Sequence, residues 1–359
     1  MIHEPFPVHV ADVDLPFRCV DAGVTPGPAV AAQFERAWPS YRRWFLHEGE
    51  EARASYADCR DAVRLWMPEM AADYTALVDA VGGGDLQARF LSHWCPPPLV
   101  AACSIAMLGV PSPLLIRNYD YPPVLCDALA LRTHWSGRSV IGMSDCGWGL
   151  MDGINDRGLT IAISFGGRRE VGRGFGIGLV VRYLLQVAQT TADAVQRLAG
   201  LPVQMSYNVA IVDALGDRRV VAVAPDRPAR ELPNACAANR QGETDWPQHA
   251  DYCNTVVREE QLSALVSFPL TDVGDLEAAF VRPPLYRSLV DSTWGTVYSA
   301  SYDPRAGTLT LLWPDDRWTL WLDSFESGER ARSVLALLPE LGPVRTEVPH
   351  VHEGTLFLM

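Results

Sequence analysis

The proline triplet Pro96-Pro97-Pro98 constrains the fold of this chain more than any other feature, because the character of the sequence changes there. Proline lacks a backbone N–H and fixes φ, so three in succession end a helix and cannot join a strand ladder. Before the triplet, over residues 29–81 and 86–94, apolar residues recur every three or four positions, which predicts helices. After it, short apolar runs predict strands.

The first two predicted strands form a hairpin that brings a cysteine back to an arginine and an aspartate. Residues 99–107 are an apolar run around Cys103, residues 109–113 contain two prolines and indicate a turn, and residues 114–120 return with Arg117 and Asp120. If Cys103 became a new N-terminus, its α-amine, with a pKa of about 7.7–8.0, could serve as its own general base. Asp120 could then bind the ammonium group, and Arg117 could favour the thiolate.

The same hairpin also fits a structural reading, in which a buried cysteine lies beside an ion pair, since free cysteine is among the most buried residue types. Cys146 is a second candidate nucleophile because it lies in a glycine-flanked turn. Asp145 beside it would raise the pKa of that thiol rather than lower it.

Composition excludes several classes of function. The chain has 359 residues, 48% of them hydrophobic, and can bury a sizeable core. Its net charge of −13 gives no basic footprint for nucleic acid or for an anionic membrane surface, so neither partner is expected. All 30 basic residues are arginine, which excludes a lysine Schiff base.

The 8 cysteines are scattered without a CxxC pair, and the first residues lack the charged and apolar regions of a signal peptide. We therefore expect reduced thiols and a cytoplasmic location, with no transmembrane segment. No HExxH motif occurs, and His350 and His352 are an isolated pair, so no metal site is expected.

A coarse reading of the chain predicts a layered α+β architecture. Residues 1–28 look like an irregular arm. Strands are expected at 140–143, 149–151, 159–165, 207–212, 219–223, 296–302 and 308–313, and helices at 178–199, 255–266, 272–281 and 326–339.

A glycine-rich stretch, residues 166–178, follows a predicted strand and precedes a helix. Its spacing matches neither GxGxxG nor GxxxxGK[ST], so we favour a mobile substrate loop over a phosphate cradle. Its arginines would be available for a carboxylate; they are Arg168, Arg169 and Arg173.

Several segments follow Cys103 in a fixed order: Arg117-Asn118-Tyr119-Asp120, then DGINDRGL at 152–159, SYNVAIVD at 206–213, AAN at 237–239, and TVYSASYDP at 296–304. Over roughly residues 90–320 the sequence resembles the isopenicillin N acyltransferase family. Its members are N-terminal-nucleophile cysteine hydrolases related to the bile-salt and penicillin V hydrolases.

This resemblance implies a four-layer αββα fold with a helical N-terminal segment. Residues 1–102 would become an α-chain by self-cleavage between Ala102 and Cys103, and residues 103–359 would form the catalytic domain. Cys103 would be the nucleophile, Asp120 would orient its α-amine, Arg117 would stabilise the thiolate, and Asn239 would donate to the oxyanion.

A second oxyanion donor is expected from the backbone near Ser164 or Phe165, and Tyr119 and Asn118 are expected at the substrate. For Asn239 the alternative is an ordinary turn asparagine.

The implied activity is that of a self-processing amidohydrolase or acyltransferase acting on the amide or thioester of an N-acyl small molecule or an amino-acid-like amine. No cofactor is expected, although acyl-CoA could act as a co-substrate. The two chains would stay together as an α/β heterodimer, and homo-oligomerisation is left open. The alternatives are a hydrolase that never cleaves itself and a non-catalytic binding scaffold.

Overall fold

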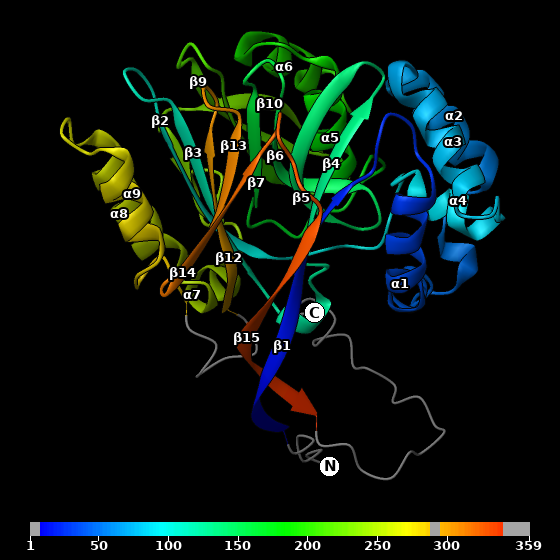
Figure 1. Cartoon of the computed structure of the whole chain (residues 1–359), viewed down its shortest axis with the longest axis horizontal. Coiled ribbons are helices and arrows are strands. Elements are labelled where there is room, and N and C mark those ends of the chain that lie inside the picture. The colour runs from blue at the N-terminus through cyan, green and yellow to red at the C-terminus, as the bar shows by residue number, and fades with distance from the viewer. Residues whose placement is uncertain (1–7, 288–294, 340–359) are drawn as a thin grey trace.

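Two β-sheets face each other and carry helices on their outer faces, in the layer order αββα (Figure 1). This computed structural model describes residues 8–287 and 295–339. The predicted four-layer α+β architecture is confirmed.

The larger sheet has nine strands in the order β10-β9-β8-β7-β6-β5-β4-β1-β15. Neighbouring strands are antiparallel except β1 and β4, which run parallel. The strands are β1 (Val8–Asp21), β4 (Leu129–Trp135), β5 (Arg138–Asp145), β6 (Gly149–Asn155), β7 (Thr160–Phe165), β8 (Tyr207–Val212), β9 (Arg218–Ala224), β10 (Arg227–Leu232) and β15 (Gly328–Pro339).

The smaller sheet has six strands in the order β11-β2-β3-β12-β13-β14 and contains the predicted hairpin. Its strands are β2 (Ala102–Leu108), β3 (Leu114–Tyr121), β11 (Cys236–Ala237), β12 (Gly295–Asp303), β13 (Thr308–Trp313) and β14 (Asp316–Trp321). Across the hairpin, Cys103 is paired with Tyr119 and Ala102 with Asp120.

Helices cover both outer faces. Packed with the nine-stranded sheet are α1 (Pro28–Phe45), α2 (Tyr56–Trp66), α3 (Ala71–Ala80), α4 (Asp85–Leu91), α5 (Ile177–Val187) and α6 (Thr191–Ala199). On the six-stranded sheet lie α8 (Thr255–Ser267) and α9 (Val273–Phe280), with α7 (Pro247–Tyr252) beside α8. Single 3₁₀ turns occupy Glu50–Ala52, Pro68–Met70 and Pro123–Leu125.

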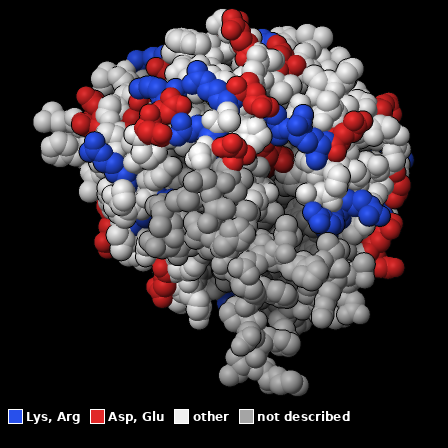
Figure 2. All heavy atoms as spheres, turned by 60° about the horizontal axis from the view of Figure 1, so that its bottom comes forward, with Lys and Arg blue, Asp and Glu red and all other residues white. Residues whose placement is uncertain are grey.

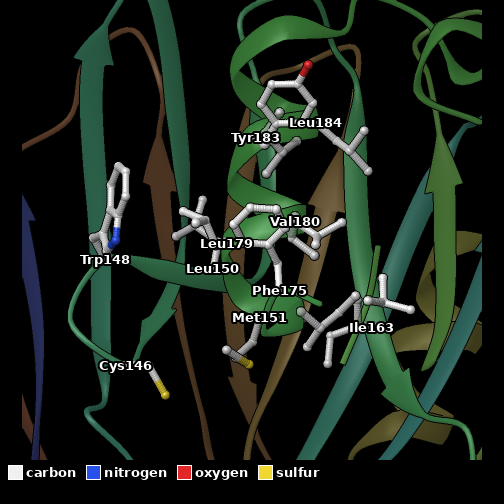
Figure 3. Close-up of a cluster of buried hydrophobic side chains, with 14 of the residues drawn as sticks. Cys146, Trp148, Leu150, Met151, Ile163, Phe175, Leu179, Val180, Tyr183 and Leu184 are labelled. Atoms are coloured by element: carbon white, nitrogen blue, oxygen red, sulfur yellow. The ribbon is translucent and has the colours of Figure 1, made fainter. Parts of the chain in front are cut away.

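Apolar side chains fill the space between all four layers. Between the sheets, alternate residues of β2 such as Cys103, Ile105 and Met107 meet side chains of the nine-stranded sheet, as the period of two in a strand requires. On the outer face of that sheet, Leu184 and its neighbours on α5 pack over β6 and β7 (Figure 3). The nine-stranded sheet therefore has a buried apolar core on each of its two faces.

Three expectations about elements were wrong. Residues 1–28 are not an irregular arm, because they contain β1, and residues 326–339 are not a helix, because they contain β15. These two strands pair with each other in antiparallel register from Val8↔Pro339 to Cys19↔Gly328. Such a pairing joins opposite ends of the sequence, so local periodicity does not reveal it.

The third error was a single helix over residues 178–199. The structure has two helices there, α5 and α6, separated by residues 188–190. Thr190 is the N-cap of α6, with its side chain accepting from the Asp193 N–H, which supplies one of the unsatisfied donors of a new helix start. The domain division at residue 102 stays a prediction, and the N-terminal segment contributes β1 as well as helices.

Leu184 provides a test of the core. It is fully buried, so Leu184→Ala should lower the free energy of unfolding by about 2–5 kcal/mol, through lost apolar burial and a residual cavity. The matched control is Leu65→Ala, since Leu65 is 71% exposed and should cost no more than about 0.5 kcal/mol. Urea unfolding followed by tryptophan fluorescence measures both, and equal losses would contradict this packing.

Candidate active site

Cys103 lies near the start of β2, with its side chain in the core between the two sheets. The Arg117 guanidinium of β3 reaches it directly, since Nη2 donates to Sγ at 3.2 Å. Both side chains are fully buried. Because alternate residues of a strand share a face, Cys103, Arg117 and Tyr119 all face the nine-stranded sheet. The structure thus brings together the cysteine and the arginine singled out in the sequence.

Arg117 is fixed by the opposite sheet. Its Nε donates to the Ile163 carbonyl at 2.8 Å, and its Nη1 donates to Asp152 Oδ2 at 2.5 Å. Asp152, on β6, is itself fully buried, so the Arg117–Asp152 ion pair is inaccessible to solvent. Asp152 belongs to the DGINDRGL segment, for which no catalytic role was expected.

Asp120 lies on the other face of β3, beside the peptide bond that precedes Cys103, because its register partner is Ala102. Its Oδ1 accepts from Thr296 Oγ1 at 2.7 Å, and its Oδ2 is 3.6 Å from Arg258 Nη1. Burial raises the pKa of Asp120, while Arg258 and Thr296 act to lower it. The carboxylate is therefore placed next to the nitrogen that cleavage would release.

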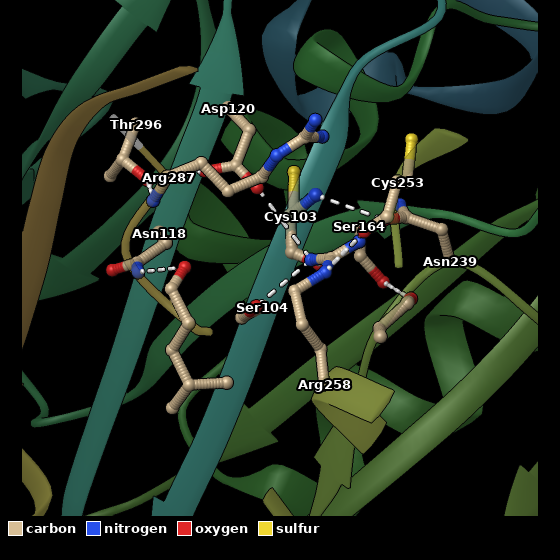
Figure 4. A network of polar contacts seen from close by, with 12 residues as sticks. Cys103, Ser104, Asn118, Asp120, Ser164, Asn239, Cys253, Arg258, Arg287 and Thr296 are labelled. Carbon is tan, nitrogen blue, oxygen red and sulfur yellow. Dashed lines mark hydrogen bonds and ion pairs between the residues drawn. The ribbon is translucent and has the colours of Figure 1, made fainter. Parts of the chain in front are cut away.

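Arg258 is a site residue that sequence reasoning missed. It lies in the first half of α8, and the structure buries it completely under β2 (Figure 4). Its Nη1 donates to the Cys103 carbonyl at 2.6 Å and to Ser104 Oγ at 2.9 Å, and its Nη2 donates to Asn239 Oδ1 at 2.6 Å. An arginine within a helical pattern looks like a solvent-facing residue, so only the packing of α8 against β2 reveals this one.

Asn239 contacts Cys103, and its expected role as an oxyanion donor stays a prediction. Its Oδ1 accepts from the Cys103 N–H at 3.2 Å, and its Nδ2 donates to the Phe165 carbonyl at 3.1 Å (Figure 4). Gly167, at φ +71°, packs against the same residue: a Cβ there would stand 2.2 Å from the Asn239 carbonyl oxygen. The start of the glycine-rich stretch is thus a close backbone support for Asn239.

The remaining predicted residues fall into two groups. Ser164 and Phe165 adjoin Asn239, since Ser164 Oγ donates to the Ala238 carbonyl at 2.6 Å and Phe165 provides the carbonyl that Asn239 binds. Tyr119 is close as well, with its ring 4.5 Å from the Arg117 guanidinium carbon.

The side chain of Asn118, by contrast, is directed away from the Cys103 thiol. Its Nδ2 donates to the carbonyls of Phe280 and Leu285, at 2.9 and 3.0 Å, on the helix-covered face of the sheet. Strand alternation turns it away from the face that Arg117 and Tyr119 share. Its contacts tie β3 to α9 and the segment that follows.

The expectation about the arginines of the glycine-rich stretch is wrong for Arg168. This side chain is buried and makes a two-point contact with Asp226, at 2.7 and 2.8 Å, with Glu170 and Asp245 also within 4 Å. It is therefore committed to structural ion pairs. Arg169 lies over the Trp246 ring, with its guanidinium carbon 4.4 Å from the ring centroid.

Beyond Tyr119 lie two carboxyl groups, of which Asp145 is buried and Asp127 is half-buried. The Tyr119 hydroxyl donates to Asp145 Oδ2 at 3.0 Å, and the Tyr41 hydroxyl of α1 donates to Asp127 Oδ2 at 2.8 Å. The Cys146 N–H donates to Tyr41 Oη at 2.8 Å. Burial raises the pKa of Asp145 to about 6, and burial together with Asp145 raises that of Asp127 well above the usual range. Tyr41 thus ties the N-terminal segment to the two loops that contain Asp127 and Cys146.

The two candidate nucleophiles differ in their surroundings. Burial raises the pKa of the Cys103 thiol in the continuous chain, and Arg117 is the strongest influence in the opposite direction. At Cys146, burial, Asp145 and Asp127 all raise the pKa, well above its usual value. The sequence argument against Cys146 is therefore consistent with its environment, and the lowered pKa expected for a released Cys103 stays a prediction.

A small cavity of about 30 Å³ lies where the N-terminal segment meets the rest of the chain. Its walls are largely apolar and come from both sides of the predicted cleavage point. They include Trp44, Phe90, Leu99, Cys146, Met151 and Tyr207; Figure 3 shows Cys146 and Met151 at this end of the core.

On the face shown in Figure 2, arginine and acidic side chains are interspersed over the described surface. Within residues 8–287 and 295–339, no helix has the length and apolar character needed to cross a membrane. In the same part of the chain, no group of three or more His, Cys, Asp and Glu side chains is arranged to hold a metal ion.

The αββα layers are those expected from the resemblance to N-terminal-nucleophile hydrolases. Residues 109–249 match the family model described as acyl-coenzyme A:6-aminopenicillanic acid acyl-transferase. The predicted resemblance to this family is thereby confirmed over a span that contains Arg117, Asp120, Asp152 and Asn239 and begins after Cys103. No curated protein matches the sequence significantly.

Solved structures with similar folds have low sequence identity. Penicillin V acylase from Agrobacterium tumefaciens is 10% identical, with a TM-score of 0.45, over 63% of this chain and 90% of that chain. A mutant conjugated bile acid hydrolase from Clostridium perfringens is 12% identical, with a TM-score of 0.38, over 64% and 96%. A Caenorhabditis elegans ortholog of N-acylethanolamine-hydrolyzing acid amidase is 12% identical, with a TM-score of 0.40, over 61% and 99%.

The carboxyl pair generates a prediction about pH. Because the pKa of Asp145 in the folded state, about 6, exceeds the value of about 3.9 for an exposed aspartate, the folded chain binds the extra proton between these pH values. The contribution of protonated Asp145 to the stability of the fold is therefore complete below about pH 4 and is lost as the pH rises through about 6. Asp145→Asn should remove this part of the pH dependence.

The measurement is urea unfolding at about pH 4.5 and about pH 7 in a Cys103→Ala background, which keeps the chain in one piece. The control is Asp79→Asn, since Asp79 is exposed. A pH dependence in Asp145→Asn that equals the control's would contradict the assignment.

Proposed function

We propose that this chain is a self-processing N-terminal-cysteine enzyme that transfers or hydrolyses the acyl group of an N-acyl small molecule. The observation that carries the proposal is the direct contact of Arg117 Nη2 with Cys103 Sγ, at 3.2 Å, inside a dry core. An arginine in such a place favours the thiolate, which is the nucleophilic form of cysteine.

Maturation would begin with attack of the Cys103 thiol on the Ala102 carbonyl. The peptide C–N bond breaks as the thioester C–S bond forms, and the thiol proton passes to the departing nitrogen of Cys103. Water then hydrolyses the thioester, leaving a carboxylate on Ala102 and a free α-amine on Cys103. The position of Asp120 opposite Ala102 supports this step, because its carboxylate would bind the new ammonium group.

In turnover, the released α-amine would take the thiol proton as Sγ attacks the substrate carbonyl, and would later protonate the leaving amine. Asn239 has two hydrogens on Nδ2, of which one is bonded to Phe165, so the second could be donated to the oxyanion. Arg258 would hold both Asn239 and the Cys103 carbonyl in place. A backbone N–H near Ser164 or Phe165 would be the second oxyanion donor.

The family supports the proposed substrate class. The matched family model is named for transfer of an acyl group from acyl-coenzyme A to an amine, which supports an N-acyl compound or an acyl thioester as substrate. The cavity wall, which comes from both sides of the predicted cleavage point, supports an α-chain that stays bound. No cofactor is needed, and acyl-CoA would serve as co-substrate in the transfer direction.

Limited alkylation tests this proposal. Iodoacetamide at neutral pH should label Cys103 first, with a parallel loss of turnover on a panel of chromogenic N-acyl amides, because only Cys103 has an arginine on its sulfur. Cys146→Ala is the control and should lose activity at the same rate as the wild type. If the label falls on Cys146 and activity is lost with it, the assignment of the nucleophile is wrong.

Asp120→Asn separates orientation of the amine from assembly of the fold. The substitution keeps the shape and the Thr296 contact but removes the charge, so turnover should fall by about 100-fold or more. Because the buried Arg258 loses its carboxylate partner, the melting temperature should fall as well, and turnover is compared at temperatures where both proteins are folded. Turnover close to the wild-type value would mean that another group orients the amine.

A non-catalytic binding scaffold is the competing proposal, favoured by the complete burial of Cys103 and the raised pKa of its thiol. In that case no cysteine would be alkylated quickly, and no member of the amide panel would be turned over.

A further inference from the structure

Two tyrosines of β12 converge on the carboxylate that holds Arg117. Tyr302 Oη donates to Asp152 Oδ1 at 2.5 Å, and Tyr298 Oη donates to Asp152 Oδ2 at 3.2 Å. The two residues lie four positions apart on one strand and therefore on the same face, and both are fully buried. Each oxygen of Asp152 thus has its own tyrosine.

Tyr298 is also bonded to the arginine, since Arg117 Nη1 donates to Tyr298 Oη at 3.2 Å. Its hydroxyl therefore accepts from the cation and donates to the anion at the same time. Burial, and next to it the charge of Asp152, raises the pKa of both tyrosines well above the usual value. They remain protonated and can act only through hydrogen bonds.

The two tyrosine hydroxyls affect how the Arg117 guanidinium divides its hydrogen bonds between Asp152 and the Cys103 sulfur. A buried carboxylate without other donors would draw the guanidinium fully onto itself, because an unpaired charge in a dry core is costly. The two tyrosine hydroxyls donate some of the hydrogen bonds that the Asp152 carboxylate can accept. Arg117 can then keep Nη2 on the sulfur of Cys103 while Nη1 binds Asp152.

We propose that Tyr298 and Tyr302 are positioning residues for the nucleophile, which act through Asp152 to keep the Arg117 guanidinium directed at the Cys103 thiol. The inference rests on the proposed function, since it assumes that Cys103 is the reactive thiol. Both tyrosine hydroxyls are bonded to Asp152, so they reach the Cys103 thiol only through Asp152 and Arg117. The other charged groups that act on the thiol are Asp120 and Arg258, and neither is bonded to these tyrosines.

The test is the pH dependence of Cys103 alkylation by iodoacetamide in wild type, Tyr298→Phe and Tyr302→Phe. Removal of either hydroxyl should draw Arg117 toward Asp152 and move the midpoint of the rate profile to higher pH. We expect the rate at neutral pH to fall by about threefold or more, which corresponds to a shift of about half a pH unit. Turnover should fall in parallel, with KM changing less than kcat.

Tyr74→Phe is the matched control, because Tyr74 is buried and its hydroxyl donates to the Ala88 carbonyl at 2.8 Å, far along the chain from the site. It loses a buried hydrogen bond of the same kind and should leave the alkylation profile unchanged. Melting temperatures of all three variants show whether a loss of rate reflects unfolding, and each single variant is scored only at temperatures where it is folded.

The outcomes separate the two proposals. If wild-type Cys103 is not alkylated faster than the other cysteines, the proposed function fails. If wild-type Cys103 is reactive but both tyrosine variants keep its pH profile, or move it to lower pH, only the positioning role is wrong.

Discussion

The candidate site depends on the contact between Arg117 and Cys103. This contact is possible because the two sheets face each other across the core. The arginine starts on the smaller sheet, crosses the core and is anchored on the larger one, at the Ile163 carbonyl and Asp152. A guanidinium in a dry core needs such partners, because an uncompensated buried cation would destabilise the fold by several kcal/mol. This arginine is therefore a polar link between the two sheets, and the sulfur of Cys103 lies at its end.

The second half of the site is built on the opposite face of the same hairpin. There Arg258 bonds the Cys103 carbonyl and Asn239, while Asp120 lies beside the peptide bond before Cys103. The thiol and the nitrogen of one residue are thus served by two separate polar networks, one between the sheets and one under α8. In the proposed function, this separation would let the fold hold the thiol and the released amine of Cys103 independently.

The sequence predicted the parts of this arrangement that depend on short-range order. A proline turn and two apolar runs are enough to pair β2 with β3, and the family motif then assigns Arg117, Asp120 and Asn239 to the neighbourhood of Cys103. Strand alternation alone could not have separated Asn118 from Asp120, since both lie on the face of β3 opposite to Arg117 and Tyr119. What distinguishes Asn118 is its pair of hydrogen bonds to the carbonyls of Phe280 and Leu285. Arg258 and the pairing of β1 with β15 could not be predicted, because both depend on contacts between segments that no local pattern connects.

The central claim is that the chain cuts itself before Cys103 and that the new N-terminus is the nucleophile. Intact mass measurement of the purified protein under denaturing conditions tests it most directly. The account predicts two fragments, residues 1–102 and 103–359, whose masses sum to that of the precursor plus one water, and a single uncut chain for Cys103→Ala. A folded wild-type chain that remains in one piece, or one cut at any other bond, would contradict it.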